Sequence, residues 1–336
     1  MRKIDRPLTV EGKNSKNKNP RRGKSFGYQV LGFGAGGGEN FIKATVSGSC
    51  NAITTCGSCQ IATFKSPGTF CVSQIAECAV NNVVSYMVVA GGGGSGDYYG
   101  AGGAGGGFRE TKSPATPYTA SPLDGYPTPG NRITVTATGY PIAIGGAGVK
   151  GCRSGPSYTG GSGGTSTFST ISSAGGGGGG GAPPPVGTAN GVPGGSGGGA
   201  GGANPGGSGG TGNTPPTTPA QGNNGGNATS TNARGGGGAA ATVGDTYPNG
   251  GGGMGAGTEI NPDCGVGTVG PSAPLRYFAG GGNGNNPFSN PYSGVGGGGG
   301  AVANPTGCGA TNMGGGGGSE AKAGGSGIVI IRYKTK

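Results

Sequence analysis

Residues 175–181 are seven consecutive glycines (GGGGGGG), the longest of many glycine runs in a chain that contains 92 glycines among 336 residues. Glycine buries almost no side chain and loses more backbone entropy on folding than any other residue. Apolar residues make up only 30% of the chain, less than in an ordinary soluble domain. If the chain is ordered, main-chain hydrogen bonds must supply most of the order, whereas the same composition also permits disorder. This favours a structural or surface-display protein over an enzyme.

A period of three marks the central glycine-rich region. Read in triplets, this region places Ser196, Ser208, Thr211 and Thr214 in one phase, together with Pro205, and fills most other positions with Gly or Ala. A left-handed extended helix has three residues per turn, so one phase of the sequence lies on one face. The Gly and Ala faces would let neighbouring backbones approach closely and hydrogen-bond to one another.

This pattern predicts a mainly β protein with a bundle of extended, polyglycine II-like glycine helices and no significant α-helix. A collagen triple helix requires glycine at every third position, and residues 213–221 (NTPPTTPAQ) break that rule. We expect this segment and residues 183–185 to connect successive glycine helices.

Apolar segments outside the glycine runs predict short β-strands. The most apolar of them, residues 83–90 (VVSYMVVA), is short and rich in β-branched side chains, which favours a buried strand over a helix. Residues 132–138 alternate apolar side chains with threonines, the period of a half-buried strand. A Pro-Gly turn at residues 65–68 separates two further strands. The expected strands are residues 25–33, 41–46, 61–64, 69–72, 83–90, 132–138, 140–144, 165–171 and 328–333.

Positive charge is concentrated at the start of the chain. Nine of the 22 Lys and Arg residues lie in residues 1–24 beside two acidic residues, so this arm carries +7 of the net charge of +11. A basic arm can bind nucleic acid, an acidic surface or an anionic partner protein, or can be a solvated tail. No signal-peptide core and no long apolar run is present, so we expect no membrane insertion. The residues that we expect to dock the arm are Arg2, Lys3, Arg6, Arg21, Arg22 and Lys24.

Five of the eight cysteines lie within residues 50–78. An even number of cysteines is compatible with disulfides in an oxidising compartment. Cys56 and Cys59 have the spacing of a redox or zinc pair, but the chain has no histidine and nothing here predicts the helix that a redox pair opens. We therefore expect surface disulfides or buried thiols. The candidate disulfide residues are Cys50, Cys56, Cys59, Cys71 and Cys78.

The sequence offers little for catalysis. Histidine, the usual general base, is absent, and the acidic residues beyond the first strands are scattered without an evident pair. Matches to the GxGxxG pattern arise by chance in so much glycine, and no phosphate-binding loop sequence is present. We expect no catalytic residue, no cofactor and no metal site.

Aromatic residues gather in one Pro- and Gly-rich region. Tyrosines on exposed loops suit the recognition of glycans or proteins, because the ring stacks and the hydroxyl hydrogen-bonds. Lys150, Arg153 and Arg109 lie in the same region and could help to bind an anionic polymer. The alternative is that these rings cover the ends of the sheet. The candidate receptor-binding residues are Tyr98, Tyr99, Phe108, Tyr118, Tyr126 and Tyr158.

Four segments, taken in order, resemble the glycine-rich domain of bacteriophage tail and tail-fibre proteins, including those of marine phages. They are a strand pair around a Pro-Gly turn at residues 64–72, a valine strand that runs into glycines at 83–94, GAGGGFR at 103–109, and GGSGIVIIRY at 324–333. The resemblance covers residues 60–334. It implies that the strand at 328–333 pairs with the strand at 83–90 and so clamps the two ends of the glycine-rich middle. It supplies no catalytic residues.

The resemblance and the composition together predict a phage virion structural protein, in particular a tail fibre or tail-tip appendage that attaches to the host surface. We expect residues 1–40 to dock to other virion proteins, residues 41–82 to form a cysteine-containing β segment, and residues 83–336 to form the glycine-rich domain, closed by a strand at 327–334. We expect a homo-oligomer in the virion that binds a host glycan or protein. One alternative is a non-adhesive collar, head-decoration or sheath-like component. The other is a basic glycine-rich nucleic-acid-binding protein, although the aromatic residues of this chain are not interleaved with arginine as in proteins that bind single strands.

Overall fold

The structure is a computed structural model that describes residues 40–154, 157–181, 189–202, 206–228, 234–239, 250–262, 265–284, 294–299 and 307–336. The chain divides into two units, Met1–Asn40 and Phe41–Lys336, and every element below belongs to the second. The expected strand at residues 25–33, the connection at 183–185 and the docking residues Arg2, Lys3, Arg6, Arg21, Arg22 and Lys24 lie outside the described residues.

The fold is mainly β, as the sequence predicts, and the helical elements among the described residues are two short 3₁₀ turns. In chain order the elements are β1 (Lys43–Val46), β2 (Ala52–Cys56), β3 (Cys59–Phe64), β4 (Gly68–Gln74), η1 (Ala79–Asn82), β5 (Val83–Val89), β6 (Phe108–Thr111), η2 (Pro129–Asn131), β7 (Ile133–Thr134), β8 (Gly139–Ala143), β9 (Ser166–Phe168), β10 (Ile171–Ser173), β11 (Ala256–Thr258), β12 (Thr268–Val269), β13 (Arg276–Phe278) and β14 (Ile328–Lys334).

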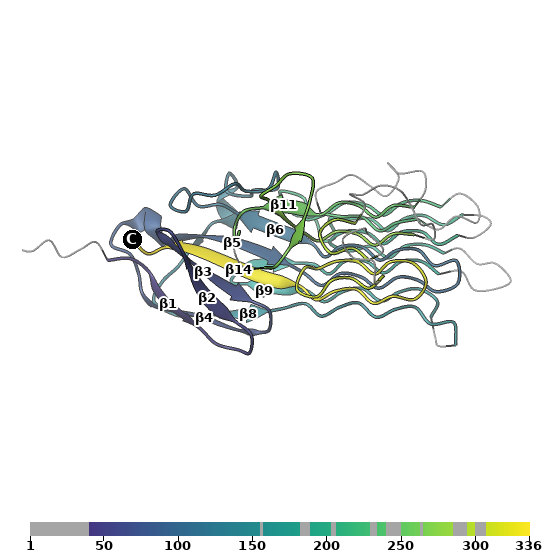
Figure 1. The fold of residues 1–336 in the computed structure, drawn as a ribbon, viewed down its shortest axis with the longest axis horizontal. Helices are drawn as coiled ribbons and strands as arrows, with labels where there is room; N and C mark the ends of the chain where they lie inside the picture. The colour runs from purple at the N-terminus through teal and green to yellow at the C-terminus, as the bar shows by residue number, and fades with distance from the viewer. Residues whose placement is uncertain are drawn as a thin grey trace, which may run out of the picture. The chain divides into compact units, whose positions relative to one another are not determined.

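The last strand of the chain lies in the middle of the central sheet, whose order is β2-β3-β14-β5-β6 (Figure 1). β14 pairs antiparallel with β5, so that Ile328 is opposite Val89 and Arg332 is opposite Ser85. On its other side β14 pairs antiparallel with β3. The predicted pairing of the closing strand with residues 83–90 is therefore confirmed, and it brings the two ends of the glycine-rich middle together.

The central sheet separates two hydrophobic clusters. Alternate residues of β14 face opposite sides: Val329 and Ile331 enter one cluster, and Ile328 and Ile330 enter the other. The first cluster is completed by the sheet β1-β4-β8-β9-β10, and the second by the small sheet β11-β13-β12. The result is three β layers, in which β5 and β14 of the middle sheet are buried on both faces and are accordingly rich in Val and Ile.

Three strand predictions need correction. Residues 165–171 do not form one strand: they contain β9 and the start of β10, which pair antiparallel across a turn at Ser169 and Thr170. The strands around the turn at residues 65–68 both form, but they do not pair with each other, because β3 joins the central sheet and β4 joins the β1 sheet. The turn therefore crosses between two layers, and Phe64 and Phe70 pack in the same cluster on either side of it. Within residues 132–138 only Ile133–Thr134 is a strand, although Ile133 and Val135 are buried and Thr134 is exposed, as the alternation predicts.

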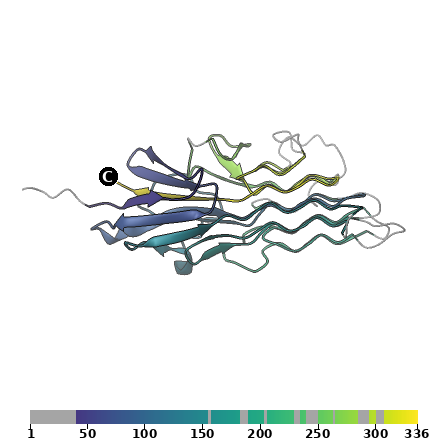
Figure 2. The same cartoon turned by 90° about the horizontal axis from the view of Figure 1, so that it is seen from below.

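Extended glycine-rich segments run from the edge of the sheets and lie side by side (Figure 1 and Figure 2). Residues 91–97 continue directly from β5, residues 101–107 lead back into β6, and residues 321–327 lead into β14. Since the core strands enter and leave the glycine segments directly, the hydrophobic sheets fix the positions at which the glycine segments start.

Candidate functional site

Residues 91–97 form hydrogen bonds with a strict period of three. The backbone N–H groups of Gly91, Gly94 and Asp97 donate to the carbonyl groups of Gly164, Gly161 and Tyr158, at 3.0, 2.9 and 2.8 Å. Each step of three along the donor segment is matched by a step of three backwards along the acceptor segment. The two segments are therefore antiparallel, and the donor presents one N–H per turn to this neighbour.

The other residues of this segment bond to other neighbours. Gly92 and Ser95 donate to residues 325 and 322, and Gly93 and Gly96 donate to residues 104 and 101. The carbonyl groups in turn accept from three more segments, at residues 148 and 151, 176 and 179, and 317. One extended segment is thus surrounded by six others, and its backbone donors and acceptors are satisfied without the i→i+4 bonds of a helix or the two-sided ladder of a sheet.

The packing leaves no room for side chains at most glycines. A Cβ atom on Gly92, Gly93 or Gly94 would lie closer than 3.0 Å to a backbone carbonyl oxygen of a neighbouring segment. Such overlap cannot be relieved by rotating a side chain, because both partners are backbone atoms. Alanine is accommodated at particular positions, such as Ala101 and Ala104, which are three residues apart and fully buried. The glycine content is therefore a packing requirement.

The predicted phase of polar residues is partly observed. Ser208, Thr211 and Thr214 are exposed, as expected of one face, but Ser196 is fully buried. Residues 213–221 form the expected connection, because the segments on either side of it are antiparallel neighbours, with Gly225 donating to the carbonyl group of Gly210 at 2.9 Å.

The far end of residues 91–97 carries a compact cluster, which we call the tip cluster: Asp97, Tyr98, Tyr99, Arg153 and Tyr158. Tyr98 and Tyr99 both have positive φ, at 57° and 52°, which is uncommon for residues other than glycine and concentrates where a turn is held by its surroundings. The two rings meet edge to face with 4.9 Å between centroids. Tyr99 is 47% exposed, so the turn presents an aromatic surface to solvent.

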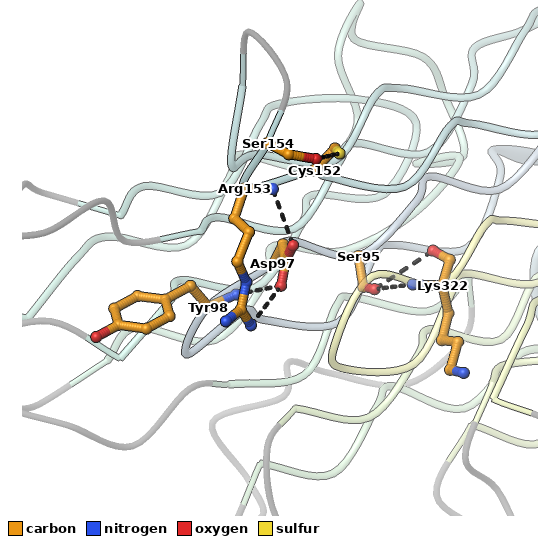
Figure 3. Close-up of polar contacts among 7 residues, drawn as sticks. All are labelled: Ser95, Asp97, Tyr98, Cys152, Arg153, Ser154 and Lys322. Atoms are coloured by element: carbon orange, nitrogen blue, oxygen red, sulfur yellow. Dashed lines mark hydrogen bonds and ion pairs between the residues drawn. The ribbon is translucent and has the colours of Figure 1, made fainter.

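Asp97 joins this turn to a second turn at Arg153 and Ser154 (Figure 3). Its carboxylate accepts hydrogen bonds from the backbone N–H of Tyr98 at 2.7 Å and from the backbone N–H of Arg153 at 2.9 Å. It also forms an ion pair with the Arg153 guanidinium at 3.1 Å. The hydrogen bond from the Arg153 side chain is the main cause that lowers the pKa of Asp97, and it raises the pKa of Arg153.

The Arg153 guanidinium lies over the Tyr98 ring, 5.2 Å from its centroid. The Arg153 side chain is 61% exposed. A shallow depression of about 360 Å³ lies next to this turn, lined by Val149, Lys150, Cys152, Ser157, Thr159, Gly160 and Gly161. The tip cluster therefore offers stacking surfaces, a cation and polar groups beside a concave surface.

The remaining predicted aromatic residues lie elsewhere. Phe108 is 1% exposed and packs in the core beneath the small sheet. Tyr118 packs against that same cluster and contacts Arg332 through a cation–π interaction, 5.3 Å from the ring centroid. Tyr126 contacts Arg132 in the same way, at 4.4 Å. The sequence alone could not separate these residues from the tip cluster, because all of them follow Pro- and Gly-rich segments.

Glu110 is a buried carboxyl group that sequence reasoning did not single out. It is 2% exposed and accepts hydrogen bonds from the Ser121 backbone N–H at 2.9 Å and from the Thr258 hydroxyl at 2.6 Å. Burial is the main cause that raises the pKa of Glu110, and these hydrogen bonds oppose the shift. The carboxyl group therefore links β6 to β11, and we assign it a structural role.

The five cysteines of residues 50–78 are free thiols in the structure. Cys56 and Cys59 lie directly opposite each other at the turn between β2 and β3, and Cys59 is buried. Cys50, Cys71 and Cys78 are exposed. Disulfide formation among them stays a prediction.

In the part of the chain that the structure describes, no three His, Cys, Asp or Glu side chains gather to form a metal site. No helix within those residues has the length and apolarity needed to cross a membrane.

A family model described as a glycine-rich domain matches residues 65–334. The match begins at the turn between β3 and β4 and ends in β14, so it includes the core strands as well as the glycine segments. No curated protein matches the chain.

Proposed function

Because the chain belongs to the glycine-rich domain family, we propose that it is a bacteriophage virion protein, in particular a tail-fibre or tail-tip appendage that displays loops for attachment to the host surface. The proposal also rests on the resemblance of residues 64–72, 83–94 and 324–333 to phage tail proteins. In this function the protein is structural and has no catalytic role. It acts in the virion, in contact with other virion proteins and with further copies of itself.

The observation that carries the proposal is the hydrogen bonding of residues 91–97 to six neighbouring segments. We propose that the glycine segments are polyglycine II-like helices, since a three-residue period of bonds to different neighbours is what threefold extended helices require. A bundle held by backbone bonds resists bending and leaves few side chains on its surface. Such a scaffold suits the display of loops at a distance from the site where the protein is anchored.

The tip cluster supports host attachment as the purpose of the display. Tyr98 and Tyr99 expose aromatic surface on a turn with positive φ, and preorganised aromatic loops bind partners with little loss of conformational entropy. Arg153 adds a cation beside them. These groups fit a host-surface glycan or protein.

One observation favours the alternative of a non-adhesive collar, head-decoration or sheath-like component. The Asp97 carboxylate and the Arg153 guanidinium already satisfy each other, so this ion pair could serve only to join two turns of the bundle.

A binding experiment separates the two functions. The labelled full-length protein is incubated with host cells, and the variant Tyr98→Asn with Tyr99→Asn is compared with Tyr126→Ala. Asparagine tolerates positive φ, so the turn is preserved while both rings are lost. The adhesin function predicts that the double variant loses cell binding and that Tyr126→Ala retains it. Equal binding of both variants and the parent protein would contradict a role of the tip cluster in attachment.

A further inference from the structure

Residues 206–212 lie at a lateral edge of the glycine bundle. Within the described residues, their backbone bonds reach only the segments that contain residues 191–198 and 225–228. Ser208 and Thr211 are exposed, whereas Gly207 and Gly210 are buried. A segment inside the bundle has neighbours all around it, so this segment has open sides where a further glycine segment could be added.

Asparagine side chains occupy the bonding positions on those sides. The Asn190 side-chain oxygen accepts the N–H of Ser208 at 2.9 Å, the Asn227 oxygen accepts the N–H of Gly209 at 2.8 Å, and the Asn224 oxygen accepts the N–H of Gly212 at 2.8 Å. Asn190, Asn224 and Asn227 are themselves exposed. A carboxamide oxygen is chemically a peptide carbonyl, so each side chain takes the place of a neighbouring backbone.

Two of these caps repeat with the period of the bundle. Asn224 and Asn227 are three residues apart, and the amides that they cap, Gly209 and Gly212, are also three apart in the opposite direction. The residue after each asparagine donates its own N–H to the same segment, Gly225 to the carbonyl of Gly210 and Ala228 to that of Gly207. Side chain and backbone thus bond alternately to one segment, and this regularity sets the caps apart from an isolated surface contact.

A second edge of the bundle is protected differently. This edge is formed by residues 145–151. Within the described residues, four of its backbone N–H groups donate no hydrogen bond, those of Gly146, Ala147, Val149 and Lys150. Here the side chain of Val149 is 70% exposed and that of Lys150 is also exposed. Branched and charged side chains prevent the close backbone approach that a glycine segment needs, as charged residues do on the edge strands of sheets. Residues 206–212 carry no charged side chain, and among them only Thr211 is branched.

We propose that Asn190, Asn224 and Asn227 close this edge of the bundle against a glycine-rich segment of a second copy of the chain. An uncapped N–H at Ser208, Gly209 or Gly212 is a donor that a second copy can satisfy with a backbone carbonyl, which would extend the bundle sideways. The asparagine caps satisfy these donors within the chain. They therefore restrict association of the protein to other surfaces.

The test compares the full-length triple variant Asn190→Ala, Asn224→Ala and Asn227→Ala with the parent protein. The matched control is Ser208→Ala with Thr211→Ala, which truncates exposed side chains of the capped segment and leaves the caps intact. Amide hydrogen exchange is read at Ser208, Gly209 and Gly212, and association is measured by sedimentation over a range of concentrations. We expect the triple variant to associate more strongly with increasing concentration. We also expect these three amides to exchange roughly tenfold faster in dilute solution.

Unchanged exchange at the three amides, an equal change in the control variant, or faster exchange without added association would each overturn the proposal. Protection at Gly93 and Gly94 shows in the same experiment whether the bundle is folded. If the triple variant does not fold, the single variant Asn227→Ala exposes only the amide of Gly209 and is judged by the same two measurements.

Discussion

The backbone N–H of Gly93 donates to the carbonyl oxygen of Ala104 at 2.8 Å. The two residues lie on antiparallel segments that are joined by the turn at Tyr98 and Tyr99. Gly93 has no room for a side chain, whereas the side chain of Ala104 is buried. The difference follows from the direction of the Cα–Cβ bond. A Cβ on Gly93 would overlap the carbonyl oxygen of Gly177, whereas the Cβ of Ala104 occupies a position that the bundle leaves open for it.

This difference predicts that substitutions at these two hydrogen-bonded positions destabilise the protein by unequal amounts. Gly93→Ala should destabilise the protein by about 3 kcal/mol or more, because the new Cβ forces its own backbone or that of Gly177 to move. Ala104→Gly should cost only about 1 kcal/mol, mainly through backbone entropy. Unfolding by denaturant measures both changes. Equal small losses would show that the glycine segments are too loosely packed for the hydrogen bonding described.

The closing strand should be essential to stability. Ile330 is fully buried at the centre of β14, and its truncation in Ile330→Ala should cost about 2–5 kcal/mol through lost burial and a cavity. The matched control is Val269→Ala, since Val269 is 62% exposed and its truncation should change the free energy of unfolding by about 0.5 kcal/mol at most. Similar effects of the two variants would argue against a clamp formed by β14 between β3 and β5.

We expect Glu110 to make the free energy of unfolding depend on pH. Burial raises the pKa of Glu110 above its ordinary value of 4.5, so the folded protein retains a proton that the unfolded chain releases. The stabilising contribution is therefore complete below pH 4.5, and it is lost as the pH rises through the folded pKa, at about 1.4 kcal/mol for each unit between the two pKa values.

Glu110→Gln should remove this pH dependence, because glutamine stays neutral and can keep both hydrogen-bond contacts. The free energy of unfolding is measured from pH 4 to pH 8 for the parent protein, for Glu110→Gln and for Glu259→Gln, whose carboxylate accepts a hydrogen bond from the Thr119 backbone. We expect the advantage of Glu110→Gln to grow with pH. Parallel curves for all three proteins would show that Glu110 is not responsible.

Cys56 and Cys59 should be the first cysteines to pair on oxidation. They are directly opposed across the turn between β2 and β3, and cross-strand Cα atoms at about 5.5 Å fall within the range that a disulfide spans. With glutathione disulfide as oxidant, each Cys56–Cys59 bond formed would reduce one glutathione disulfide to two glutathione thiols. Peptide mapping after partial oxidation reads the result. Preferential pairing of Cys50 or Cys71 instead would contradict the prediction.

The sequence predicts the fold best where hydrophobicity is concentrated. The apolar runs of β5 and β14 clearly predict strands. Their pairing fixes the positions at which the glycine-rich middle of the chain begins and ends. β11, β12 and β13 were not predicted, because strands of two or three residues in a polar, glycine-rich context leave no periodic signal. Which glycine segments become neighbours also depends on contacts far apart in the sequence, as the bond from Gly92 to Gly325 shows.

The candidate site was predicted only in part. Tyr98, Tyr99 and Tyr158 do come together, and Arg153 lies among them. Phe108, which follows a similar glycine run, is instead the first residue of a core strand. The asparagine caps had a signal in the sequence, the three-residue spacing of Asn224 and Asn227, but its meaning depends on which segment lies opposite.

The most direct test of the account is amide hydrogen exchange of the full-length protein, read at residues 91–97, 101–107 and 174–181. We predict that the bonded glycine amides of these segments exchange as slowly as those of β14, while the unbonded amides of Gly146 and Ala147 exchange rapidly and serve as an internal reference. Rapid exchange at Gly92, Gly93 and Gly94, at the rate of that reference, would contradict a hydrogen-bonded glycine scaffold and with it the proposed display function.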